Sequence, residues 1–98
     1  MLSLKKEPKN RCKIEQVFAS KGRVKIIKIL LEEEELNISE IVDRCRLNHK
    51  STLKHLKFLT KIGILQEKIY GRIRIYRIRF EDYRVKAIKD MFDIWKTF

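Results

Sequence analysis

The sequence predicts one α+β domain, mostly helical, with the order helix, helix, short strand, helix, helix, hairpin, helix. The chain has 98 residues, which is the size of one small domain and leaves no room for a second. Apolar residues make up 44% of it, with three Gly and one Pro, so a core can form. The apolar spacing is helical as far as Gly63 and then changes to the alternation of strands.

The N-terminal segment divides into an arm and a first helix. Residues 1–10 are polar, basic and interrupted by Pro8, and we expect them to form a flexible arm. The folded domain is then expected to span residues 11–98. Its first helix is predicted over residues 11–19, where three apolar side chains share one face: Ile14, Val17 and Phe18.

The middle of the chain predicts two helices separated by an extended segment. Ser20 is a candidate N-cap for a helix over residues 21–34, whose apolar stripe is Val24, Ile27, Leu30 and Leu31. Residues 36–38 look extended, and Ser39 is a candidate N-cap for a short helix over residues 40–46. Its inward residues are expected to be Ile41, Val42 and Cys45.

A fourth helix follows a short turn at residues 46–48. It is predicted over residues 49–62 and ends at Gly63, which can adopt the left-handed conformation that closes a helix. On a helical wheel Thr52, Leu53, Leu56 and Leu59 fall in one sector, while Lys50, Lys54, Lys57 and Lys61 fall in another.

The last third predicts a hairpin and a terminal helix. Residues 64–79 are β-branched and aromatic, alternate with charge, and are divided at Tyr70-Gly71. Because the alternation changes phase, we expect a bulge or a two-sided strand near Tyr76. Residues 81–98 form the last predicted helix, with acidic residues at its start.

The charge distribution predicts a polyanionic partner. The formal net charge is +11, and residues 44–79 contain eleven basic residues against one acidic residue. A localised basic block is typical of a surface that binds nucleic acid or an anionic membrane. The alternative is a basic surface that only contacts solvent.

Two helices joined by a three-residue turn, with a basic hairpin directly after them, form a winged helix-turn-helix pattern. The segments LNHKSTLKHLKFL (47–59), IGIL (62–65) and YGRIRIY (70–76) resemble the ArsR-type winged-helix family, and most of all its small archaeal and archaeal-virus members. The resemblance covers residues 20–98. It implies a homodimeric, sequence-specific transcription regulator that binds double-stranded DNA, with the helix 49–62 in the major groove.

The recognition helix supplies the first set of candidate DNA contacts. Because the N-terminal turns of such a helix contact the bases, the candidates are His49, Lys50, Ser51, Leu53 and Lys54, followed by Lys57 on phosphate. Leu53 stands where the family usually has a small polar residue, and it either contacts a thymine methyl or packs in the core. The alternative for the lysines is the solvated face of an amphipathic helix.

The hairpin supplies the second set. Arg72 and Arg74 lie at its tip, where the resemblance implies contact with the minor groove or the backbone, and narrow minor grooves favour arginine. Arg77 and Arg79 lie farther from the tip, and such charges often protect the edge of a sheet.

The apolar residues of the last helix cover about half of its circumference, more than one core needs. The resemblance implies that this helix joins the first helix in a homodimer interface, formed by Ile14, Phe18, Val85, Ile88, Met91, Phe92, Trp95 and Phe98. The alternative is a helix that lies deep across its own domain.

The two cysteines receive different interpretations. Cys45 is interpreted as a small buried hydrophobe. Cys12 lies at the start of the first helix, so we hypothesise a Cys12–Cys12 disulfide across the dimer axis. A composition rich in Ile, Lys, Arg and Glu resembles that of a thermophile, in which disulfides inside the cell are tolerated.

Other function classes find little support. His49 and His55 do not share a helical face, and no set of three convergent ligands can be assembled, so we expect no metal and no cofactor. Catalytic constellations and phosphate-binding loops are not found, so we expect no enzyme. The sequence has no apolar run of 18 residues and no signal peptide, so we expect no membrane association and a cytoplasmic location. The origin can be cellular or viral. We find no evident small-molecule effector. The competing function is a chromatin-like architectural protein with little sequence preference.

Overall fold

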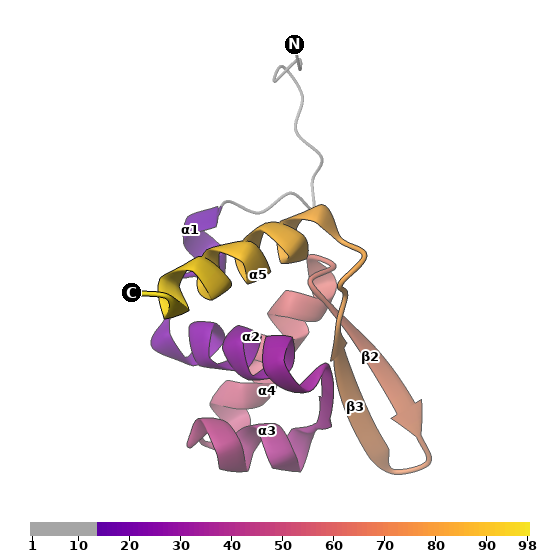
Figure 1. The fold of residues 1–98 in the computed structure, drawn as a ribbon. Coiled ribbons are helices and arrows are strands. Elements are labelled where there is room, and N and C mark those ends of the chain that lie inside the picture. Colours follow the sequence, from indigo (N-terminus) through magenta and orange to yellow (C-terminus); the bar gives the residue numbers. More distant parts are fainter. Residues whose placement is uncertain (1–13) are drawn as a thin grey trace, which may run out of the picture.

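The computed structural model describes residues 14–98 and has the predicted order of elements (Figure 1). The expected arm and the first residues of the first helix lie outside the described residues. The five helices and three strands are α1 (Ile14–Val17), α2 (Lys21–Glu33), β1 (Glu35–Asn37), α3 (Ile38–Cys45), α4 (His49–Lys61), β2 (Leu65–Tyr70), β3 (Ile73–Ile78) and α5 (Tyr83–Lys96). The predicted mostly helical winged helix-turn-helix is therefore confirmed.

The helix starts show which capping residues the chain uses. Ser20 caps α2 as predicted, since its side chain accepts a hydrogen bond from the Arg23 backbone N–H. The prediction of Ser39 as the next cap is wrong. Asn37 caps α3 instead, because its side chain accepts from the Glu40 N–H while the Glu40 carboxylate accepts from the Asn37 N–H. This reciprocal pair is a capping box, which satisfies two backbone donors at once.

The C-terminal end of α4 is closed by the glycine that the sequence indicated. Gly63 has φ of +85°, and the backbone N–H of Ile64 donates to the carbonyl of Leu59. Two arginines from later elements donate to the last carbonyls, Arg79 to Gly63 at 2.9 Å and Arg84 to Ile62 at 2.8 Å. Cations suit this end of a helix, so these arginines tie α4 to the hairpin and to α5.

The sheet is antiparallel with the strand order β1-β3-β2. The β2–β3 register runs without interruption from Leu65 opposite Ile78 to Tyr70 opposite Ile73. The bulge considered near Tyr76 is therefore absent from this hairpin, and the strand is two-sided instead. Tyr76 and Ile78 are buried, whereas Ile73 is exposed.

The core lies where α2, α3 and α4 meet the sheet. Its fully buried members include Ile26, Ile27, Leu30, Ile41, Leu56, Leu59, Ile64, Leu65, Ile78 and Val85. Cys45 is 4% exposed and belongs to this cluster, as the sequence indicated. In α2 the deepest residues are Ile26, Ile27 and Leu30, while the predicted Val24 and Leu31 are only partly buried.

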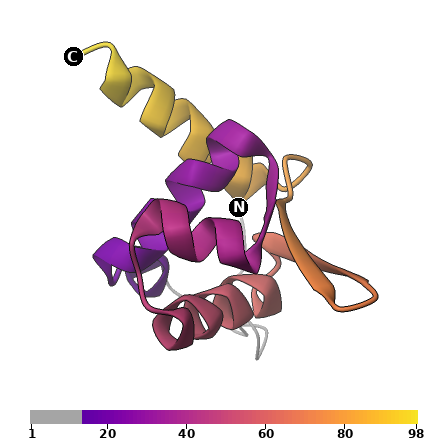
Figure 2. The same cartoon turned by 90° about the horizontal axis from the view of Figure 1, so that it is seen from below.

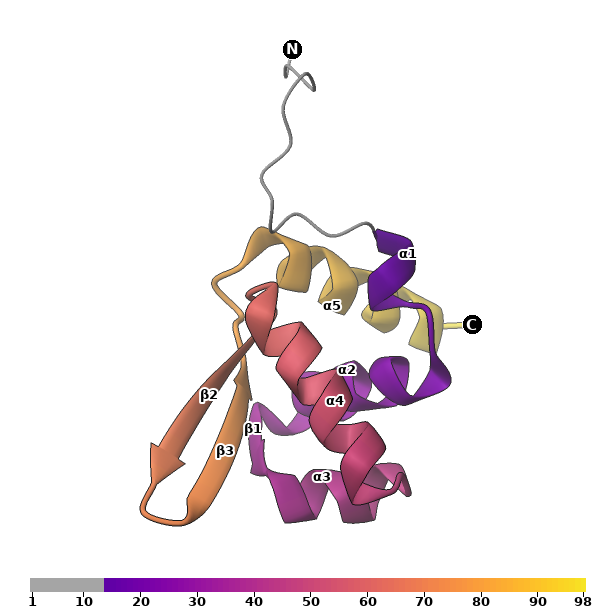
Figure 3. The same cartoon turned by 180° about the vertical axis from the view of Figure 1, so that it is seen from behind.

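Two elements extend away from this helical body. The β2–β3 hairpin projects from one side, with α4 beside its base (Figure 3). Helix α5 lies across α2, and its C-terminal half extends beyond the other elements on the opposite side (Figure 2). The candidate DNA-binding and dimer surfaces are therefore separated in space.

Candidate nucleic-acid interface

The N-terminal turn of α4 is held open to solvent by its cap. Asn48 accepts a hydrogen bond from the Ser51 backbone N–H at 2.7 Å, and the Thr52 hydroxyl donates to the Asn48 carbonyl at 2.9 Å. These bonds fix the first turn, where His49 and Lys50 are exposed and Ser51 is partly exposed. The unpaired N–H groups of such a turn also favour an anion.

The lysine face of α4 is exposed along its whole length. Lys50, Lys54, Lys57 and Lys61 are all exposed, and none of them takes part in an ion pair between described residues. On the opposite side Thr52, Leu56 and Leu59 are fully buried. Leu53 is partly exposed at the border and is not among the described apolar residues that pack against the core. Its side chain therefore borders the lysine face.

His55 points away from the lysine face, which the sequence did not indicate. The Arg23 Nε donates to His55 Nδ1 at 3.2 Å, and the guanidinium lies 3.9 Å from the centre of the Phe58 ring. Arg23 also donates to the carbonyl of Gln16. Burial, helped by the charges of Arg23 and Lys54, lowers the pKa of His55. This cluster joins α4 to α2 away from the lysine face.

The hairpin separates its arginines into two groups. Arg77 and Arg79 both bond the Glu81 carboxylate at 3.1 Å, and the hydrogen bonds from Arg77 chiefly hold the pKa of Glu81 at about 2. Arg72 and Arg74 are exposed and form no ion pair with a described carboxylate. The tip is thus the part of the hairpin whose charges remain available to phosphate.

A side-chain hydrogen bond joins the two strands of the hairpin on the side that faces the core. The Tyr76 hydroxyl donates to Glu67 Oε2 at 2.6 Å across the two strands. Burial, and then the bond to Glu67, raises the pKa of Tyr76 to about 12. Tyr76 therefore stays neutral at physiological pH, and its hydroxyl remains the donor in this cross-strand bond.

The residues assigned to the dimer interface lie on α5 and in or just after α1, and they have three different environments. Val85 is fully buried in the protomer, where a partner chain cannot reach it, while Phe18, Ile88 and Phe92 are partly buried against the same core. The exposed members are Ile14 at 70%, Met91 at 44%, Trp95 at 78% and Phe98 at 101%. Ile94, which was not assigned to the dimer interface, is also 60% exposed.

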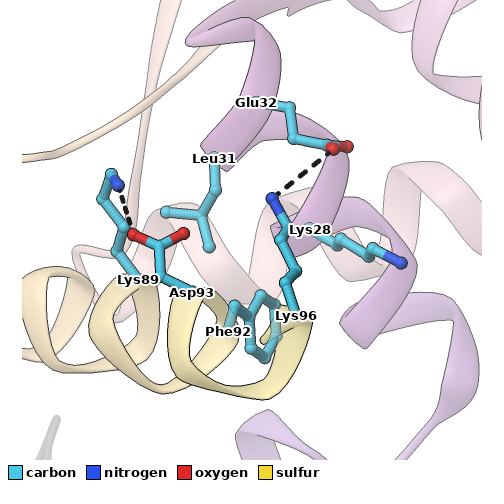
Figure 4. A pocket seen from close by; sticks show the side chains of 7 residues that line it. All are labelled: Lys28, Leu31, Glu32, Lys89, Phe92, Asp93 and Lys96. Carbon is cyan, nitrogen blue, oxygen red and sulfur yellow. Dashed lines mark hydrogen bonds and ion pairs between the residues drawn. The ribbon is translucent and has the colours of Figure 1, made fainter. Parts of the chain in front are cut away.

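One side of α5 packs against α2. Figure 4 shows Leu31 and Phe92 in a crevice between the two helices, with Lys96 paired to Glu32 at 3.9 Å and Lys89 paired to Asp93 at 2.7 Å. Beside this crevice lies an apolar groove of about 430 Å³ that is lined by Val24, Lys28, Met91, Phe92, Trp95 and Lys96. The exposed apolar residues of α5 thus continue into a groove of the same protomer.

Within residues 14–98 no group of three His, Cys, Asp or Glu side chains could hold a metal ion. Burial raises the pKa of the Cys45 thiol, against the charges of Lys25 and Arg44. Cys12, proposed to form an interchain disulfide, lies outside the described residues. No helix in the part of the chain that the structure describes is long and apolar enough to cross a membrane.

The comparisons with known proteins agree with this geometry. Residues 20–67 match the family model described as "Bacterial regulatory protein, arsR family". This segment runs from the N-cap of α2 through α4 into β2. No curated protein matches the chain.

Solved structures share the fold. The AntR antimony-specific transcriptional repressor has a TM-score of 0.72 at 18% identity, over 99% of this chain and 96% of that chain. HlyU from Vibrio cholerae has a TM-score of 0.69 at 23% identity, over 79% of this chain and 80% of that chain. The transcriptional repressor BigR from Xylella fastidiosa has a TM-score of 0.68 at 14% identity, over 78% and 74%. These comparisons do not show the expected closeness to archaeal proteins.

Proposed function

We propose that the chain is a homodimeric, sequence-specific regulator of transcription that binds double-stranded DNA, because residues 20–67, from the N-cap of α2 into β2, match the arsR family model. The observation that carries this proposal is the exposed lysine row of α4 together with the exposed arginines of the hairpin tip, none of which forms an ion pair between described residues. The helix and the hairpin both carry positive charge, which complements the negative phosphates that border a DNA groove.

In this proposal the first turn of α4 enters the major groove. His49, Lys50, Ser51, Leu53 and Lys54 contact base edges or nearby phosphates, and Lys57 contacts phosphate. Arg72 and Arg74 contact the minor groove or its backbone. The Arg23 cluster supports the arrangement, since it holds α4 against α2 through His55 and Phe58.

The exposed arc of α5 supports the dimeric part. Trp95 and Phe98 are large apolar side chains in solvent, and a surface of this kind on a small domain marks an interaction site. Pairing with a second copy would cover Ile14, Met91, Trp95 and Phe98 around a two-fold axis. The hypothesised Cys12 disulfide belongs to the same interface and remains a proposal.

A salt titration tests the proposal. A duplex enriched by the protein from a randomised pool is titrated by fluorescence anisotropy at several salt concentrations. A dimer with roughly 6 to 10 phosphate contacts should give a log-log slope of about −5 to −9. Lys54→Ala should reduce the magnitude of the slope by about 1 per protomer, while the exposed Lys86→Ala on α5 should leave it unchanged.

The same titration separates the two DNA-binding functions. A regulator should bind the enriched duplex about 10³ times more tightly than a scrambled duplex. A ratio near one would indicate the chromatin-like protein instead, and a salt slope near zero would rule out both.

A further inference from the structure

The tip of the hairpin carries an apolar ridge that the proposed function does not use. Tyr70 is 59% exposed and Ile73 is 54% exposed, and the two residues lie directly opposite each other in the β2–β3 register. Cβ atoms of directly opposed residues lie about 4.5–5.5 Å apart, so such side chains pack together. Because residues two apart share a face, the partly exposed Ile75 continues the ridge toward the base.

This ridge is unusual for the solvent side of a hairpin. An antiparallel pair normally presents polar side chains there, and an exposed apolar ridge on an edge strand invites aggregation. The turn has only two residues, Gly71 and Arg72, with φ of +61° at Gly71. Tyr70 and Ile73 are therefore the last paired residues of the hairpin, whose projection is seen in Figure 3. A partner that covers this end would remove the exposed area from water.

The charges around the ridge indicate the chemistry of the partner. Arg72 lies in the turn between Tyr70 and Ile73. Arg74 lies opposite Ile69 on the other face of the hairpin, beside Tyr76, and neither arginine is in an ion pair among the described residues. Exposed apolar side chains with cations close to them match a groove whose walls are sugars and whose borders are phosphates. The hairpin also follows directly on the lysine face of α4, since the Ile64 N–H bonds the last turn of that helix.

We propose that Tyr70 and Ile73 form an apolar wedge that enters the DNA minor groove between Arg72 and Arg74 and partly unstacks one base step. The inference rests on the proposed DNA binding and adds to it the mode of contact. A minor groove about 6 Å wide is too narrow for a two-stranded ribbon, whereas an inserted apolar side chain opens the step and bends the duplex toward the major groove. Flexible pyrimidine–purine steps such as TA are the expected targets.

Two measurements on the complex with the enriched duplex test the wedge. The bend is measured by resonance energy transfer between the duplex ends, and unstacked thymines are detected by permanganate. Wild type should bend the duplex by about 20° or more and should make one thymine per half-site reactive. The Tyr70→Ser/Ile73→Ser double variant should bind about tenfold more weakly, without the bend and without the reactive thymine.

Matched variants keep the test independent of folding. Tyr83→Ser removes an aromatic side chain that is 84% exposed at the start of α5 and should bend DNA as wild type does. Tyr70→Phe and Ile73→Leu keep the ridge apolar and should also retain the bend. Equal melting temperatures of all variants would show that the hairpin variant is folded.

Three outcomes are distinguishable. A wild-type complex that forms with a steep salt slope but leaves the duplex straight and unreactive overturns the wedge and leaves the proposed function intact. Failure of wild type to bind any duplex removes both. Binding of wild type to anionic vesicles that is lost in the double variant, with the DNA complex unchanged, would assign the ridge to a membrane and overturn the wedge.

Discussion

At the scale of single residues, burial and pairing divide the many cations of this chain. Arg77, Arg79 and Arg84 are bound to carboxylates or to helix carbonyls. Arg23 is bound to a histidine and an aromatic ring. The lysines of α4 and the arginines of the tip have no such partners among the described carboxylates. The number of basic residues in the sequence is therefore larger than the number whose charge is left for binding DNA.

Substitutions within this available set should separate base contacts from phosphate contacts. Lys50→Ala should cost about 1 to 3 kcal/mol on the enriched duplex and less on scrambled DNA, because a lost base contact affects only the preferred sequence. Arg72→Ala should weaken both complexes by similar factors. Binding isotherms on the two duplexes measure this, and equal losses from Lys50→Ala on both would assign that lysine to phosphate.

The Arg23–His55 bond predicts a pH dependence of folding. His55 accepts the bond at Nδ1, and its pKa is lowered in the folded state. The unfolded chain therefore takes up the proton first, so stability is constant above the unfolded pKa of about 6.5 and decreases as the pH falls below it. Denaturant unfolding at about pH 7.5 and about pH 5.5 brackets this range.

His55→Gln keeps a neutral acceptor and should lose most of that pH dependence. His49→Gln, at the exposed start of α4, should retain it. The assignment to His55 fails when wild type is equally stable at the two pH values, or when His55→Gln responds to pH as wild type does.

At the scale of elements, local pattern decides which helices and strands form, while tertiary contacts decide their ends and their deepest residues. Periodicity predicted α2, α4 and α5 and the hairpin closely. It placed the cap of α3 at Ser39, although Asn37 is followed three residues later by Glu40, the spacing of the capping box that the structure shows. The Arg23–His55 contact joins residues 32 apart in the sequence, so no local pattern could reveal it.

The capping box of α3 gives a direct test of this choice. Asn37→Ala should destabilise the protein by about 1 kcal/mol, because the substitution leaves the Glu40 N–H without its partner. Ser39→Ala, at an exposed position in the first turn, should change stability by less than about 0.5 kcal/mol. Urea unfolding of the two variants decides the matter, and a larger cost at Ser39 would contradict the observed cap.

At the scale of the whole molecule, the hairpin and the free end of α5 extend on opposite sides of one helical body (Figures 1 and 2). A second copy on α5 would therefore leave both hairpins and both α4 helices uncovered. The core that fixes this spacing contains Val85 from α5 and Leu65 and Ile78 from the hairpin. A substitution on the exposed arc of α5 therefore leaves the side chains of α4 and of the hairpin tip unaltered.

Trp95→Glu should convert the proposed dimer to a monomer, because it places a charge on a side chain that is 78% exposed in the protomer and covered in the interface. DNA affinity should fall strongly, since two half-sites about 34 Å apart require two joined domains. Sedimentation velocity and footprinting measure both effects. Tyr83→Glu, on the same helix and 84% exposed, is the control, and a wild-type chain that sediments as a monomer contradicts the proposal.

The short strand β1 divides the hairpin into two parts with different freedom to change. It pairs with β3 only from Ile75 to Arg77, so the base of the hairpin has neighbours on both sides of β3. Beyond Ile75 the strands pair only with each other, ending in the Gly71-Arg72 turn. Residues inserted at that turn would lengthen the projection without shifting the register at the base, whereas a single insertion within 75–77 would move every side chain to the other face. The length of the hairpin can therefore change through insertions at the turn, while the helices and the β1–β3 pairing keep their arrangement.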